Sequence, residues 1–119
     1  MISNLLTEKG LKLATLENLK NLHIVNLNVS NNKIGDLGVK SLSIGLIGQA
    51  LIEKLKLSLD GVDVSEKGCH YLGRLISQLP HLTELDLNIR YNNIMLKGVQ
   101  CICTGLLSTK KLKKLKLVF

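Results

Sequence analysis

The side chains best suited to metal binding or nucleophilic catalysis are three cysteines and three histidines. They are Cys69, Cys101, Cys103, His23, His70 and His81. No two cysteines are spaced as in a CxxC motif, and the histidines form no cluster with Asp or Glu. Cys101 and Cys103 are two residues apart, so on a helix they point to different sides. The pattern therefore predicts no metal site, and we expect no catalytic residue.

Other catalytic arrangements are missing from the sequence as well. It contains no Ser-His-Asp arrangement, no paired carboxylate site and no phosphate-binding glycine loop. We therefore expect neither an enzyme nor a cofactor, and no small-molecule substrate. The odd number of cysteines favours a reducing compartment, so we expect a cytoplasmic protein. Association with the cytoskeleton is one possibility within that expectation. No apolar run reaches the ~18 residues of a membrane span, and the N-terminus does not resemble a secretory signal.

Apolar residues recur every 30 positions along the chain. Four columns are apolar throughout: Leu22, Ile52, Leu82 and Leu112; Val25, Leu55, Leu85 and Leu115; Leu27, Leu57, Leu87 and Leu117; and Val29, Leu59, Ile89 and Phe119. Such regular spacing is typical of a solenoid, in which each unit contacts only its neighbours.

The apolar spacing changes within each unit. Positions 25, 27 and 29 alternate with polar residues, which predicts a strand, whereas positions 39, 42 and 46 lie on one face of a helix. We expect parallel strands near 24–29, 54–59, 84–89 and 114–118. Helices are expected near 8–19, 36–48, 66–79 and 96–108, with Thr7 and Ser65 as N-caps. The predicted class is α/β, a curved parallel sheet with helices on its convex side.

A motif follows two of the predicted strands. LNVSNNKIGDLG at 27–38 and LNIRYNNIMLKG at 87–98 resemble the LxLxxNxLxxxG signature of ribonuclease-inhibitor-like leucine-rich repeats. The asparagines and glycines of this pattern are interpreted as structural: Asn32, Asn92, Gly38, Gly68 and Gly98. A buried asparagine amide would satisfy backbone groups where the chain leaves the strand. Glycine would let the helix start approach the neighbouring repeat, and Val62 replaces the asparagine in the second unit.

The repeat predicts one leucine-rich-repeat domain over residues 1–119. It divides into about four units of ~30 residues, at 1–28, 29–58, 59–88 and 89–119. Neither end has the polar cap that isolated solenoids need. Two interpretations stay open, a fragment of a longer array or a small protein whose ends are covered by partners.

Polar side chains on the predicted concave face form the candidate binding surface. They are Asn26, Asn28, Lys56, Ser58, Asp60, Asp86, Asn88, Arg90 and Lys116. Across neighbouring strands, Lys56, Asp86 and Lys116 alternate in charge, and so do Asp60 and Arg90. These pairs are either ion pairs of small energy or part of a recognition surface.

A protein-interaction or scaffold module within a multi-subunit assembly is the function that these patterns favour. The resemblance to ribonuclease inhibitors and GTPase-activating proteins leaves the regulation of an enzyme as an alternative, with Arg90 near the concave rim. A third hypothesis is binding of RNA or an acidic filament by a basic patch of Lys110, Lys111, Lys113 and Lys114. RNA is less favoured, because no aromatic residues are interleaved with these lysines. We expect no membrane partner.

Overall fold

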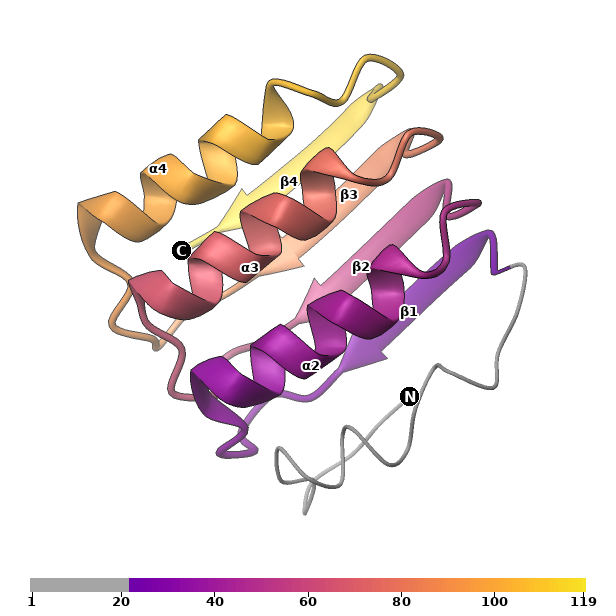
Figure 1. Ribbon diagram of the computed structural model, residues 1–119. Helices are drawn as coiled ribbons and strands as arrows, with labels where there is room; N and C mark the ends of the chain where they lie inside the picture. The colour runs from indigo at the N-terminus through magenta and orange to yellow at the C-terminus, as the bar shows by residue number, and fades with distance from the viewer. Residues whose placement is uncertain (1–21) are drawn as a thin grey trace.

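The computed structural model describes residues 22–119. Its strands are β1 (Ile24–Asn28), β2 (Lys54–Ser58), β3 (Glu84–Asn88) and β4 (Lys114–Val118), and its helices are α2 (Gly35–Ile47), α3 (Glu66–Ser77) and α4 (Met95–Leu106). The strands form one parallel sheet in chain order, and the three helices cover one of its faces (Figure 1). The predicted α/β class and the parallel strands are confirmed. The helix predicted near 8–19 and its cap at Thr7 lie outside the described residues.

The strand register follows the 30-residue repeat. Leu27, Leu57, Leu87 and Leu117 stand side by side across the sheet. Leu57 and Leu87 are buried against the helices, as the alternation predicts, because residues of one parity share one face of a strand. The core is aliphatic, and its largest fully buried side chains are Ile34, Leu46, Ile52, Leu55, Leu57, Leu59, Leu72, Leu75, Leu79, Leu82, Leu87 and Ile89.

Asparagine side chains organise the turns that leave the strands. Asn32 Nδ2 donates to Val29 O at 2.9 Å, so its buried amide satisfies a backbone carbonyl of its own turn. Asn92 also reaches back to the preceding unit, where its Oδ1 accepts from Val62 N at 3.1 Å and from Val64 N at 3.0 Å. The following unit thus supplies an acceptor to the turn in which Val62 replaces the expected asparagine.

Glycines in the helices have two different tasks. A Cβ at Gly38, Gly68 or Gly98 would overlap first with a side chain four residues earlier in the same unit. The predicted close approach to a neighbouring repeat is therefore only a secondary reason for these glycines. The backbone contact between helices lies at Gly105, where a Cβ would be 2.9 Å from the Cα of Gly73. Helices α3 and α4 pack tightly because neither residue has a side chain.

The beginning of α3 has the expected cap. Ser65 adopts an extended conformation, and its Oγ accepts a hydrogen bond from Lys67 N at 3.2 Å. The side chains of Ile34 and Ile94, which precede α2 and α4, form no cap hydrogen bond. Within residues 22–119, no helix is long and apolar enough to cross a membrane.

Candidate functional site

The face of the sheet opposite the helices forms a broad hollow. All four strands contribute side chains, and the hollow has a volume of about 360 Å³. Its lining includes Ile24, Asn26, Lys54, Lys56, Glu84, Asp86, Lys114 and Lys116. In the ribbon view no described helix covers this face (Figure 1). The polar side chains of the strands are therefore open to a partner.

Charge alternates between neighbouring strands on this face. Lys54 lies opposite Glu84, and Glu84 lies opposite Lys114. The Glu84 Oε1 atom is 3.9 Å from Lys54 Nζ and 3.6 Å from Lys114 Nζ, so one carboxylate is shared by two ammonium groups. Neither Lys54 nor Glu84 was among the residues predicted for the binding surface. The 30-residue spacing could have identified this pair, because Lys54, Glu84 and Lys114 lie in register two positions before Lys56, Asp86 and Lys116.

Asp86 lies in the centre of the candidate surface and makes no ion pair within the described part of the chain. The register places it between Lys56 and Lys116, as expected from the sequence. Among the described residues, however, the four side-chain ion pairs within 4.0 Å do not include Asp86. The predicted alternation is thus present in the register, but an ion pair across Lys56, Asp86 and Lys116 is not. An exposed ion pair contributes little free energy, which explains why long side chains leave it unformed.

Arg90 and Asp60 do form the expected pair near the strand ends. Arg90 Nη2 is 3.3 Å from Asp60 Oδ2, and the guanidinium lies 5.7 Å from the centre of the Tyr91 ring. Two neighbours therefore restrain Arg90. The other carboxylate oxygen of Asp60, Oδ1, is buried without a hydrogen-bond partner in the described part of the chain.

Asn28, Ser58 and Asn88 form a row at the ends of the first three strands. The Oδ1 atom of Asn28 accepts from Ser30 N at 3.0 Å, and that of Asn88 accepts from Arg90 N at 3.2 Å. These oxygens stabilise the turns, whereas the amide NH₂ groups donate no hydrogen bond to any described residue. The row can therefore present hydrogen-bond donors to a bound protein.

The predicted basic patch lies on the last loop and the last strand. Lys110, Lys111, Lys113 and Lys114 are all exposed. Of these four, Lys114 alone has a carboxylate within 4.0 Å in residues 22–119. Together with Lys116 on the concave face, they make this edge of the molecule strongly cationic.

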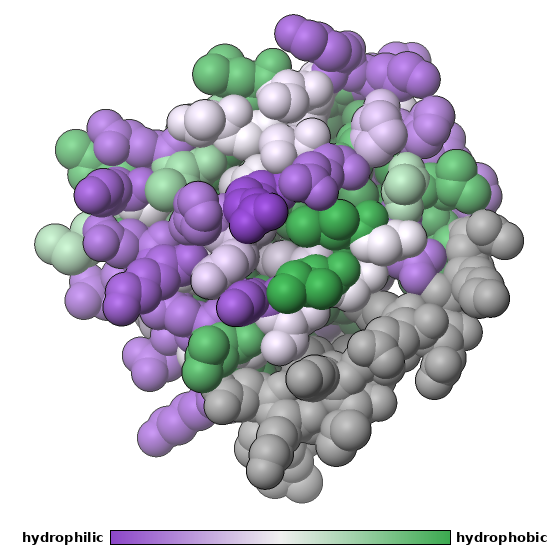
Figure 2. All heavy atoms as spheres, viewed as in Figure 1, coloured by the Kyte–Doolittle hydropathy of each residue, from purple (hydrophilic) through white to green (hydrophobic). Residues whose placement is uncertain are grey.

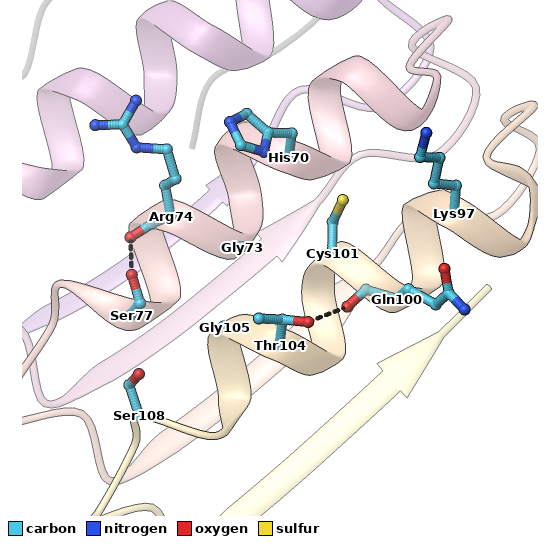
Figure 3. A pocket seen from close by; sticks show the side chains of 10 residues that line it. All are labelled: His70, Gly73, Arg74, Ser77, Lys97, Gln100, Cys101, Thr104, Gly105 and Ser108. Carbon is cyan, nitrogen blue, oxygen red and sulfur yellow. Dashed lines mark hydrogen bonds between the residues drawn. The ribbon is translucent and has the colours of Figure 1, made fainter.

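A second hollow lies on the helix side, between α3 and α4. It has a volume of about 400 Å³, and its lining includes His70, Arg74, Lys97 and Cys101 (Figure 3). Two of its hydroxyl groups are engaged in their own helices, since Ser77 Oγ donates to Arg74 O and Thr104 Oγ1 donates to Gln100 O. These two hydroxyl groups are therefore less available to a molecule bound in this hollow. Figure 2 shows hydrophilic and hydrophobic residues interspersed over the helix side.

The three cysteines differ in their exposure to solvent. Cys69 is buried, Cys101 is half-buried and Cys103 is exposed. Burial raises the pKa of the Cys69 thiol to about 12, with smaller contributions from Cys101 and Asp36, so this thiol is neutral at physiological pH. The described residues contain no group of three His, Cys, Asp or Glu side chains that could hold a metal ion.

Comparison with known proteins agrees with the geometry of the repeats. Residues 20–43 and 78–103 match the family model described as "Leucine Rich repeat". The fold is that of a leucine-rich-repeat solenoid. Neither the ribonuclease-inhibitor-like subtype nor the expected division into units is tested by this match, and both remain predictions.

A solved structure resembles nearly the whole chain in fold. The solenoid superposes on the structure titled "Leiomodin-1 Actin-Binding Site 2 (ABS2)" with a TM-score of 0.72 and 24% sequence identity. The match covers 97% of this chain but 65% of the leiomodin chain, so the solenoid spans less than two thirds of that relative. At this identity the likeness concerns the fold.

Proposed function

We propose that this chain is a non-catalytic protein-binding module that works within a larger assembly and receives its partner on the concave face. The observation that carries the proposal is the open face of the parallel sheet. The four described strands place polar side chains there at one regular spacing, and Asp86 makes no ion pair with any residue in 22–119. A rigid face of this kind loses little conformational entropy on binding.

Cross-linking from two faces of the molecule tests this proposal. A photoreactive amino acid replaces Asn88 on the concave face in one variant and Ser77 on the helix side in another. After irradiation in native extract, we expect a discrete cross-linked protein with the Asn88 variant and not with the Ser77 variant. Cross-links from Ser77 alone would place the partner on the helices. Cross-links from neither position would contradict a protein-binding role.

Filamentous actin is the first defined partner to test, because the similar leiomodin structure is titled as an actin-binding site. We propose cosedimentation of the chain with filaments, and we expect binding to weaken by about tenfold in Asp86→Lys. Glu66→Lys is the matched control, since it makes the same change of charge on α3. Equal effects of the two substitutions would indicate general electrostatic attraction and not a concave-face site.

A further inference from the structure

The middle row of the concave face carries charges that the described chain does not pair. The strand register aligns Asn26, Lys56, Asp86 and Lys116 in this row. Asp86 is half-buried between two exposed lysines, and none of these three charged side chains forms an ion pair within residues 22–119. The row therefore presents a positive, a negative and a positive charge in sequence across β2, β3 and β4.

The rows on either side offer less charge to a partner. In one of them, the Glu84 Oε1 atom is 3.9 Å from Lys54 Nζ and 3.6 Å from Lys114 Nζ, so these charges already attract one another. The other row, at positions 28, 58, 88 and 118, contains no charged side chain. Charge complementarity with a partner is therefore concentrated in the middle row.

The spacing of the three charges fits a helix that crosses the strands. Neighbouring strands lie about 4.8 Å apart, which separates the backbones of Lys56 and Lys116 by about 9.6 Å. On an α-helix, residues i, i+4 and i+7 share one face, and the first and last are about 10.5 Å apart along the axis. In an extended segment, residues i, i+2 and i+4 span about 13 Å. A helix therefore matches the row, whereas an extended segment is too long for it.

We propose that the middle row binds an α-helix of a partner protein, which lies across the strands and carries acidic, basic and acidic residues at i, i+4 and i+7. The basic side chain would contact Asp86, and the two carboxylates would contact Lys56 and Lys116. All three residues line the hollow of about 360 Å³, so the charged side chains of the helix would enter it. This inference rests on the proposed protein-binding function and names the chemistry of the partner segment.

Two helical peptides of identical composition test the order of the charges. Both are alanine-based helices held by a chemical staple, and each carries two glutamates and one lysine. The matching peptide has Glu, Lys and Glu at i, i+4 and i+7, whereas the permuted peptide has Lys, Glu and Glu there. With fluorescein labels and the full chain, we expect anisotropy titrations to show about tenfold tighter binding of the matching peptide. Equal binding of the two peptides, or binding of neither, would overturn the proposal.

Charge reversal at Asp86 separates this site from general attraction. In Asp86→Lys the row is positive throughout, so each peptide places its lysine against one like charge and its two glutamates against opposite charges. The preference should therefore disappear. In Glu84→Lys, which makes the same change of charge on the same strand, the matching peptide should remain about tenfold preferred. A preference that persists in Asp86→Lys, or that is lost in both variants, would refute binding along the middle row.

The unaltered chain gives two readings that do not depend on folding of the variants. A matching peptide with a central proline, which cannot remain helical, should bind at least about tenfold more weakly. In NMR spectra with the matching peptide at saturation, amide shifts should change along the middle row on all four described strands. Equal binding of the proline peptide, or shift changes confined to one strand or to the helices, would overturn the proposal. Cross-linking from Asn88 without a peptide preference would leave the protein-binding function intact and reject only the helix.

Discussion

The carboxylate of Asp36 accepts two hydrogen bonds from Ser65 in the next repeat. Its Oδ1 atom is 2.8 Å from Ser65 N, and its Oδ2 atom is 2.5 Å from Ser65 Oγ. Oδ1 also accepts from Gly68 N at 2.9 Å. An acidic residue in the first turn of α2 therefore satisfies free amide groups at the N-terminus of α3 and joins the two repeats.

Removal of this carboxylate should destabilise the solenoid. We expect Asp36→Ala to lower the free energy of unfolding by about 1–3 kcal/mol, because it leaves partly buried donors without their acceptor. Glu66 occupies the equivalent position in α3 and makes no ion pair or side-chain hydrogen bond within the described residues. Glu66→Ala should therefore cost about 0.5 kcal/mol or less. Urea unfolding measures the free energy of unfolding of both variants. Equal decreases would show that the hydrogen bonds of Asp36 do not contribute to stability.

The leucine column should show a gradient of stability along the sheet. Leu87 is fully buried, so Leu87→Ala should cost about 2–5 kcal/mol through lost contacts and a cavity. Leu117 lies in the same column but is only half-buried on β4, and Leu117→Ala should cost about half as much or less. Thermal unfolding of the two variants provides the comparison. A Leu87→Ala variant that melts like the unaltered chain would contradict the burial of this column.

Much of the fold follows from the sequence because the repeat has two independent periods. Alternation at Val25, Leu27 and Val29 predicts a strand, and the 30-residue recurrence predicts its parallel neighbours. The link from Asp36 to Ser65 and the contact between Gly73 and Gly105 were not predicted. Both join different repeats, and their geometry depends on how closely the helices pack rather than on the pattern within one unit.

The candidate surface was predicted less completely than the fold. The sequence placed Lys56, Asp86 and Lys116 side by side, and the register agrees. The ion pairs themselves lie one row away, at Glu84 with its two lysines. Spacing identifies which residues share a face, whereas the rotamers of long exposed side chains decide which pairs form, and no sequence period contains that information.

Tyr91 occupies a backbone conformation that suits other residues better. Its φ is 61°, in the left-handed region, where Asn31 and Gly61 stand in the two preceding units. The tyrosine is 81% exposed, so packing does not compensate for the strain. We expect Tyr91→Asn to raise the free energy of unfolding by about 0.5 kcal/mol, because asparagine tolerates this region.

The opposite substitution in this column is the control. Gly61→Ala should lower the free energy of unfolding by about 1 kcal/mol, since its φ is 60° and its Cβ would lie 3.2 Å from Asn31 Oδ1. Urea unfolding of both variants measures the effect. A loss of stability in Tyr91→Asn would show that the ring contact with Arg90 outweighs the backbone strain.

The buried thiol of Cys69 should make the stability of the chain depend on alkaline pH. Its pKa is raised to about 12 by burial, whereas an unfolded cysteine titrates near 8.5. Between these values the unfolded chain loses a proton that the folded chain keeps. The contribution of the Cys69 thiol to the free energy of unfolding is therefore fully present below about pH 8.5. It declines as the pH rises towards 12, by at most about 1.4 kcal/mol per pH unit.

Cys69→Val isolates this effect, because valine occupies the same column at Val39 and Val99. The free energies of unfolding are measured with urea under reducing conditions at pH 7, 8.5 and 10. Up to pH 8.5 the difference between the two proteins should stay nearly constant. By pH 10 the unaltered chain should have lost about 1–2 kcal/mol relative to the variant. A constant difference across all three pH values would mean that the thiol reaches water in the folded state.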